Sequence, residues 1–246
     1  MKTEIIPTIL VNTFKGVKEK IKAVEKYVNW VQIDVMDGVF VNNETWPHSV
    51  VPGRAKRGAK FVKEIDKLKE IKRSAEKKIK IEAHLMVEEP EKEFDDWLKV
   101  VDRIIVHFES KIINRDLGIK QLIEKAHKKN KEIGLALNPE THFAVITPFI
   151  GPKDSDGLDL VLLMTVQPGW GGQELKSWVL EKAEALRKIW PEGNIEVDGG
   201  VNNENIDRII KSGVNLICAG TYIYKSKNIE EAVKALRESL SRIGNS

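Results

Sequence analysis

The chain has 246 residues, of which 41% are apolar and 31% charged, and its formal net charge is +3 at pH 7. This length and apolar content suit one large α/β domain with a sizeable core. The small net charge gives no indication of nucleic-acid binding, although it suits an anionic metabolite, and no apolar run is long enough to span a membrane.

The only cysteine, Cys218, lies in the apolar run 216–219. It cannot form an intrachain disulfide, so we expect a buried, small apolar residue. The N-terminal residues pass directly into a predicted strand and show no secretory pattern. These features predict a protein of the reducing cytoplasm.

Strand-like and helix-like segments alternate along the whole chain. Val17, Ile21, Val24 and Val28 recur at the spacing of one helix face, directly after the first apolar strand. Strands are predicted at 5–10, the first half of 31–40, 79–86, 103–107, 132–137, 160–164, 195–197 and 214–219. Helices are predicted from 12 or 13 onward, over 61–71, from 90, over 119–128, near 143–150, and over 177–190, 204–212 and 229–240.

Eight alternations of strand and helix without a break in composition predict a single (β/α)8 TIM barrel spanning residues 1–246. In such a barrel the chemistry collects at the C-terminal ends of the strands. The polar, sulfur-containing and catalytic-type residues at or just beyond the predicted strand ends are Thr8, Gln32, Asp34, Met36, His84, Met86, His107, Met164 and Asp198.

Two aspartates lie near the C-terminal ends of predicted strands that share a sequence pattern, an apolar run followed by aspartate and glycine. Asp34 lies inside the apolar run 31–40, and Asp198 follows Ile195-Glu196-Val197 and precedes two glycines. Burying a carboxylate is costly unless a cation, a metal or a reacting proton compensates it. A single strand-end aspartate is explained by an ion pair, but two of them could face each other across one pocket.

Three glycine-bearing loops follow the last three predicted strands. Glycine lets backbone N–H groups approach an anion closely, and loops after the seventh and eighth strands are the recurrent phosphate position in these barrels. One such loop alone would be explained as a tight turn. The candidate phosphate-site residues are Gly169, Trp170, Gly171, Gly172, Gly199, Gly200, Gly220 and Thr221.

These motifs resemble the ribulose-phosphate 3-epimerase family. The matching segments, in order, are Pro7-Thr8-Ile9-Leu10, Asp34-Val35-Met36-Asp37-Gly38-Val39-Phe40-Val41, His84-Leu85-Met86-Val87, His107-Phe108-Glu109, Asn138-Pro139-Glu140-Thr141, residues 164–173 and Val197-Asp198-Gly199-Gly200. They extend over nearly the whole chain. The resemblance implies interconversion of D-ribulose 5-phosphate and D-xylulose 5-phosphate in the pentose phosphate pathway, with Asp34 and Asp198 as the pair that moves the C3 proton.

The resemblance also implies one divalent metal ion of the Zn, Fe, Mn or Co type. Its ligands would be Asp34, His84 and Asp198, and the second histidine usual in the family is replaced by Gln32, whose amide oxygen is a poorer ligand for zinc-like ions. Substrate contacts are implied for the Thr8 hydroxyl, for His84, for the aromatic loop residue Trp170 and for the methionines that cover the reacting carbons, Met36, Met86 and Met164.

Residues 42–58 depart from the family pattern, with extra residues directly after the catalytic strand. That loop could alter substrate preference or an oligomer contact. Two alternatives therefore stay open: a 3-epimerase of a related ketose phosphate, such as a ketohexose 6-phosphate, and a barrel that binds sugar phosphate without turnover. The only partner implied is a small sugar phosphate, with a homo-oligomer as a further possibility.

Overall fold

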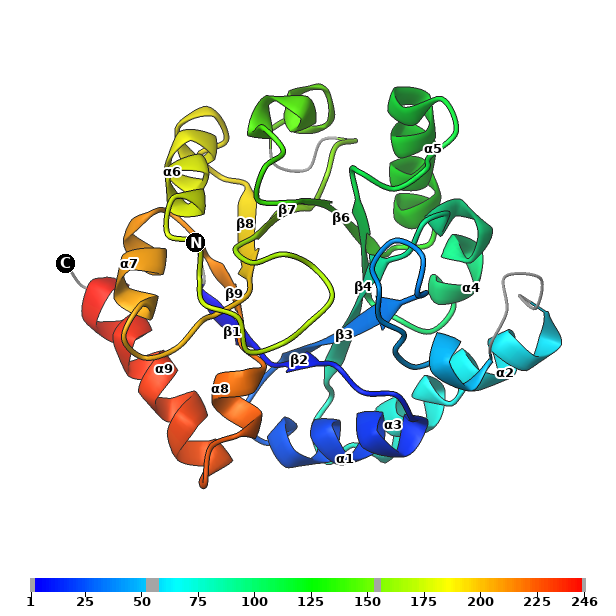
Figure 1. Cartoon of the computed structure of the whole chain (residues 1–246), viewed down its shortest axis with the longest axis horizontal. Coiled ribbons are helices and arrows are strands. Elements are labelled where there is room, and N and C mark those ends of the chain that lie inside the picture. The colour runs from blue at the N-terminus through cyan, green and yellow to red at the C-terminus, as the bar shows by residue number, and fades with distance from the viewer. Residues whose placement is uncertain (1–2, 52–57, 153–155, 245–246) are drawn as a thin grey trace.

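A computed structural model describes residues 3–51, 58–152 and 156–244, and Figure 1 shows a ring of strands surrounded by helices. The described strands form one nine-stranded sheet in which every pairing is parallel, in the order β1-β9-β8-β7-β6-β5-β4-β3-β2. The predicted TIM barrel is confirmed. Its strands are β1 Glu4–Ile6, β2 Thr8–Ile9, β3 Trp30–Met36, β4 Lys80–Met86, β5 Arg103–His107, β6 Glu132–Leu137, β7 Leu160–Met164, β8 Asn194–Asp198 and β9 Leu216–Cys218.

The first predicted strand is split by Pro7, which has no backbone N–H to donate to a ladder. Its first piece, β1, pairs with β9, and its second piece, β2, pairs with β3. The Pro7 carbonyl accepts a hydrogen bond from the Gln32 N–H at 3.0 Å. This short segment therefore closes the barrel.

The helices lie outside the ring, as predicted, with several differences in detail. They are α1 Phe14–Val24, α2 Ala59–Asp66, α3 Leu68–Ser74, α4 Phe94–Trp97, α5 Arg115–Lys128, α6 Val179–Ile189, α7 Ile206–Lys211, α8 Thr221–Tyr224 and α9 Ile229–Gly244, with 3-10 helices η1 His48–Val50, η2 Pro90–Lys92 and η3 Phe143–Phe149. The helix expected near 143–150 is the 3-10 helix η3, which contains Pro148, and α8 was not predicted at all. Residues 52–57 of the loop 42–58, and residues 153–155, lie outside the described residues.

Alternation along each strand separates two cores. On β7, Leu160, Leu162 and Met164 belong to a cluster inside the barrel, whereas Val161 and Leu163 belong to the larger cluster beneath the helices. Successive strand side chains point to opposite faces, so both faces are buried and the strands read as continuous apolar runs. Cys218 is buried in the inner cluster, as predicted.

The interior of the barrel also contains a buried polar layer that the sequence did not reveal. Arg103 Nη1 lies 2.6 Å from Glu82 Oε2 and 3.7 Å from Glu196 Oε2, and its guanidinium also contacts Glu132 and lies over the Trp30 ring. Burial by itself would lower the pKa of Arg103, but the three carboxyl groups outweigh it and raise that pKa. Buried charge of this kind is tolerated only when it is paired.

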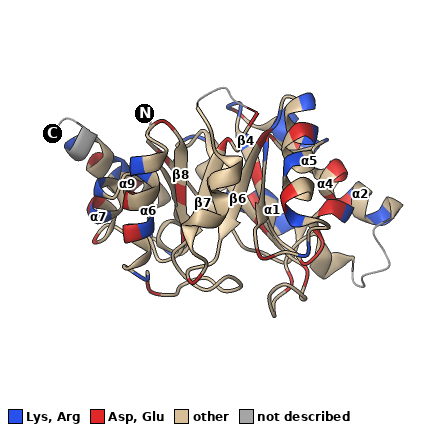
Figure 2. Cartoon of the chain, turned by 90° about the horizontal axis from the view of Figure 1, so that it is seen from above, with Lys and Arg blue, Asp and Glu red and all other residues tan. Residues whose placement is uncertain are grey.

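Outside the barrel, Lys and Arg are interspersed with Asp and Glu on the helices, as Figure 2 shows, in keeping with the small net charge. Among the described residues, every helix is too short or too polar to cross a bilayer.

Candidate active site

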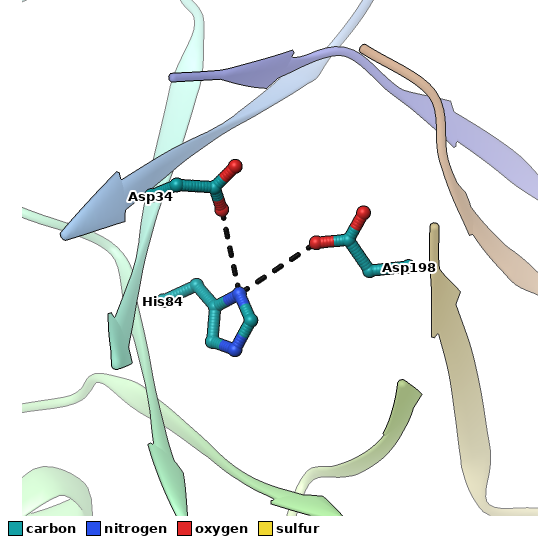
Figure 3. A group of neighbouring side chains, drawn as sticks. All are labelled: Asp34, His84 and Asp198. Carbon is teal, nitrogen blue, oxygen red and sulfur yellow. Dashed lines mark ion pairs between the residues drawn. The ribbon is translucent and has the colours of Figure 1, made fainter. Parts of the chain in front are cut away.

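Three adjacent side chains from three strands form the centre of the site. Asp34 on β3 and His84 on β4 are register partners, and Asp198 ends β8. His84 Nδ1 lies 3.4 Å from Asp34 Oδ1 and 3.6 Å from Asp198 Oδ2, and Figure 3 shows both carboxylates directed at this nitrogen. The two predicted aspartates, 164 residues apart by their numbers, therefore share one environment.

Burial and neighbouring charge shift the pKa values of Asp34 and His84. The pKa of Asp34 is raised to about 6, mainly because burial disfavours its charged form and also because Asp198 is close, while hydrogen bonds from His84 and Gln32 oppose the shift. For His84, burial opposes the charged form, but the two carboxylates outweigh it and raise the pKa to about 9. A carboxyl group that titrates near neutral pH suits general acid–base chemistry.

Gln32 on β3 lies between the two aspartates. Its Nε2 donates to Asp34 Oδ1 at 2.8 Å and to Asp198 Oδ2 at 2.7 Å, and its side chain is fully buried. The nitrogen also lies 3.4 Å from His84 Nδ1. The amide therefore faces the carboxylates with its donor end.

A thiol holds the other end of this amide. Cys218 Sγ lies 3.4 Å from Gln32 Oε1 and 3.1 Å from Glu196 Oε1. Burial, followed by the nearby charge of Glu82, raises the pKa of Glu196 well above its ordinary value. The sulfur is the donor in both contacts, so the Gln32 and Glu196 oxygens share its one hydrogen.

On its far side, His84 contacts a second buried histidine. The two Nε2 atoms of His84 and His107 lie 2.9 Å apart, and His107 Nδ1 lies 3.3 Å from Glu109 Oε2. Glu109 in turn accepts hydrogen bonds from the Asn138 N–H and the Thr141 hydroxyl. Burial, together with the nearby charge of His84, lowers the pKa of His107 to about 4. From the sequence, His107 was placed at a strand end without a role, and Glu109 was not among the candidate site residues.

The predicted substrate residues surround one cavity of about 510 Å³, a usual size for a small-molecule site. Its lining includes both aspartates and every predicted substrate-contact residue except His84, namely Thr8, Met36, Met86, Met164, Gly169, Trp170, Gly171, Gly172, Gly199, Gly200, Gly220 and Thr221. His84 and Gln32 are fully buried and contact the aspartates instead. Trp170 lines the same cavity while 62% of its surface stays exposed to solvent.

Glycine is required in the loops at the other end of this cavity. Gly200 has φ +67°, and a Cβ there would lie 2.4 Å from the Leu175 backbone nitrogen. Gly199 has φ +123°, and a Cβ there would meet the Val166 side chain at 2.4 Å. A side chain at either position is excluded both by backbone conformation and by space.

We expect Gly200→Ala to destabilise the protein by about 2–4 kcal/mol and to weaken binding of inorganic phosphate, because the loop must shift to admit a methyl group. Urea unfolding and phosphate titration measure the two effects. Gly171→Ala is the matched control for stability, since a Cβ there has its nearest contact at 3.4 Å, with Thr221 Oγ1. Equal stability of the two variants would contradict the steric argument.

The segment after β3, which departs from the family pattern, supports the catalytic strand. The Thr45 hydroxyl donates to the Asp34 carbonyl at 2.6 Å and accepts from the Met36 N–H at 2.9 Å. Asn43 Nδ2 donates to the Gly169 carbonyl at 2.7 Å, which links this segment to the glycine loop after β7. These contacts were not predicted, because they join residues whose spacing carries no periodic signal.

The residues present fit a divalent metal ion. One ligand atom each of Asp34, His84 and Asp198 lies within 4.8 Å of the others. One imidazole and two carboxylates resemble the three-ligand sets of catalytic metal sites. The Gln32 amide, however, presents a nitrogen and not an oxygen to this group, so it does not complete the set as it stands.

Comparison with known proteins gives a consistent result. The profile of the ribulose-phosphate 3 epimerase family matches residues 4–224. A ribulose-phosphate 3-epimerase of Schizosaccharomyces pombe is 33% identical over 98% of this chain and 96% of its own length, and one of Bacillus subtilis is 34% identical over 96% and 99%.

Solved structures show the same fold at lower identity. A 3-hexulose-6-phosphate synthase has 18% identity and a TM-score of 0.66, with 96% of this chain and 99% of the other covered. A 3-keto-L-gulonate-6-phosphate decarboxylase from Vibrio cholerae has 14% identity and a TM-score of 0.65, with 98% of each chain covered. The extent of the sequence match shows that the chain belongs to the ribulose-phosphate 3-epimerase family.

Proposed function

We propose that this isomerase interconverts D-ribulose 5-phosphate and D-xylulose 5-phosphate by proton transfer at C3. The observation that carries the proposal is the position of two carboxylates, Asp34 and Asp198, in one cavity that also contains the glycine loops. A purely binding barrel has no need of two adjacent carboxylates, one buried and one partly buried, that repel each other.

The reaction requires a base and an acid on opposite faces of one carbon. A proton beside a ketone is weakly acidic, so one aspartate removes it while the other delivers a proton to the opposite face, and the roles exchange with direction. The raised pKa of Asp34, about 6, matches a group that must both accept and release a proton near neutral pH. Buried Met36, Met86 and Met164 exclude water from the reacting carbon.

The phosphate group is assigned to the loops after β7, β8 and β9. Gly171, Gly172, Gly199 and Gly200 allow close approach of the backbone N–H groups, and Thr221 adds a hydroxyl. In this proposal the sugar carbons lie towards the aspartates, and the fact that both groups of residues line the same cavity supports it.

Asp34, His84 and Asp198 would hold one divalent ion of the Zn, Fe, Mn or Co type. When bound, such an ion acts as a Lewis acid that stabilises negative charge on the substrate oxygens. We place the enzyme in the cytoplasm, where the buried thiol of Cys218 stays reduced. The proposed small-molecule partner is the sugar phosphate. A homo-oligomer is the proposed assembly, to be tested by light scattering.

Removal of divalent ions by a chelator is expected to lower C3 proton exchange by at least tenfold and to leave phosphosugar binding within about threefold, because the phosphate loops contain none of the metal ligands. Dialysis followed by calorimetric titration of phosphosugar measures the binding. Restoration by added Zn²⁺, Mn²⁺ or Co²⁺ identifies the active ion. Full exchange in the chelated protein would remove the metal from the proposal but leave the carboxylate pair.

The test of the proposed function is exchange of the C3 hydrogen with solvent deuterium, followed by NMR, across pentulose 5-phosphates, hexulose 6-phosphates and the unphosphorylated sugars. We expect the fastest exchange with D-ribulose 5-phosphate. Faster exchange with a ketohexose 6-phosphate would instead assign the enzyme to that related sugar. Binding without exchange under every supplied ion would establish a non-catalytic barrel.

A further inference from the structure

The amide of Gln32 uses both of its hydrogens on the proton-transfer pair. A side-chain amide has two N–H donors and one carbonyl acceptor. One hydrogen is directed at Asp34 Oδ1 at 2.8 Å and the other at Asp198 Oδ2 at 2.7 Å. The residue is fully buried, so water does not compete for these bonds.

The opposite orientation of the amide is unfavourable in the metal-free site. Turning it by half a rotation would direct Oε1 at two carboxylate oxygens, both acceptors, in place of two hydrogen bonds. Among the described residues, the only donor near the turned oxygen would be His84 Nδ1, which lies 3.4 Å from the present nitrogen. Its NH₂ group would then face Cys218, whose thiol is the donor at 3.4 Å in the present arrangement. The thiol and the carboxylates therefore select the same orientation.

Gln32, Cys218 and Glu196 lie on different strands and meet inside the barrel. Gln32 on β3 is the partner of Thr8, Glu196 on β8 is the partner of Leu216, and Cys218 is the partner of Asp198. Sγ of Cys218 thus contacts Gln32 on one side and Glu196 on the other, at 3.4 Å and 3.1 Å. The polar layer around Arg103 is in this way connected to the catalytic aspartates.

We propose that Gln32 is a positioning residue that holds Asp34 and Asp198 together through its NH₂ group, and that Cys218 fixes the orientation of this amide. The role of this contact in catalysis depends on the proposed function. The contact also affects metal binding, because an ion between Asp34, His84 and Asp198 must displace the NH₂ group or turn the amide so that Oε1 becomes a ligand. The thiol opposes that turn.

Two measurements without sugar test this inference. The first is hydrogen exchange of the Gln32 side-chain NH₂ in metal-free, ¹⁵N-glutamine-labelled protein, with the signal assigned by its absence in Gln32→Met. We expect the Gln32 NH₂ to exchange at least 100-fold more slowly than the Gln173 side-chain amide, which donates a hydrogen bond to Gln167 in an exposed loop. In Cys218→Val, the Gln32 NH₂ is expected to exchange at least tenfold faster than in the wild type.

The second measurement is the Co²⁺ dissociation constant, determined by calorimetric titration. Cys218→Val is expected to bind Co²⁺ about 3- to 10-fold more tightly, because the freed amide can turn its oxygen to the ion. Gln32→His is expected to bind at least tenfold more tightly, since imidazole is a better ligand for this ion. Cys218→Ser keeps a hydrogen-bond donor and is the matched control, expected within about twofold of the wild type in both measurements.

The inference is overturned if the Gln32 NH₂ group exchanges as fast as that of Gln173, or if Cys218→Val and Cys218→Ser behave alike in both measurements. Cys218→Ala replaces the valine variant if the latter does not fold. Since neither measurement involves turnover, failure here leaves the proposed function intact, and absence of C3 exchange in the substrate screen leaves this inference intact.

Discussion

Replacing either Asp34 or Asp198 by asparagine is expected to lower C3 proton exchange by about 10²–10⁴-fold, because each variant removes one of the two groups that move the proton. Solvent deuterium exchange into ribulose 5-phosphate, followed by NMR, measures the effect. Phosphosugar binding is expected to stay within about threefold, since the glycine loops are unchanged. If either variant retains wild-type exchange, the two-carboxylate mechanism is wrong.

The control for this experiment is the stability of the Asp34→Asn variant, which should increase. The ordinary pKa of aspartate is about 3.9, and in the folded protein that of Asp34 is about 6, so the folded state holds this proton more tightly than the unfolded state does. Stability contributed by this group is therefore lost as pH rises from about 4 to about 6, and the loss is complete above that window. An uncharged amide avoids it.

Urea unfolding of metal-free protein should accordingly show Asp34→Asn to be more stable than the wild type by roughly 1–3 kcal/mol at pH 7, with the difference disappearing near pH 4. An inactive but more stable variant excludes unfolding as the cause of lost exchange. A less stable variant at pH 7 would show that hydrogen bonds from His84 and Gln32 outweigh the burial of this carboxylate.

The second large effect is expected at the polar layer inside the barrel. Arg103→Met should cost about 3–5 kcal/mol, because it leaves Glu82 and Glu196, both fully buried, without their cation. The free energy of unfolding in urea measures this cost. The partly exposed partner Glu132 can be solvated, so it adds little.

The double variant Arg103→Met/Glu82→Leu is the matched control, since it removes the cation together with its closest fully buried carboxylate. We expect it to recover most of the lost stability, because replacing a buried ion pair by apolar groups is often neutral whereas breaking one is not. If the double variant is no more stable than Arg103→Met alone, the loss comes from the packing of the guanidinium against Trp30 and not from charge.

The sequence predicted the barrel because its signals are local. Apolar alternation and helix periodicity extend over a few residues each, and eight repetitions leave one closed arrangement. The same alternation placed Asp34 and Asp198 at strand ends, where the structure brings them to one cavity. The split at Pro7 follows from proline's missing N–H, which interrupts the strand ladder.

Contacts across the barrel could not be predicted in this way. Trp46 lies in the loop after β3, as expected, but its full burial and its edge-on packing against Trp97 were not predicted. Likewise α8 is only four residues long, too short to produce a periodic signal. In both cases the local structure depends on contacts between residues far apart in the chain, and the spacing of residues in the sequence does not predict such contacts.

The sequence by itself determined the fold, the two strand-end aspartates and the order of the glycine loops, because each depends on residues close together in the chain. Only the tertiary structure decided that the Gln32 amide bridges both aspartates and that Cys218 holds its other end. Those contacts join strands β3, β8 and β9, and their geometry depends on how the closed sheet staggers its strands, which local sequence patterns do not encode.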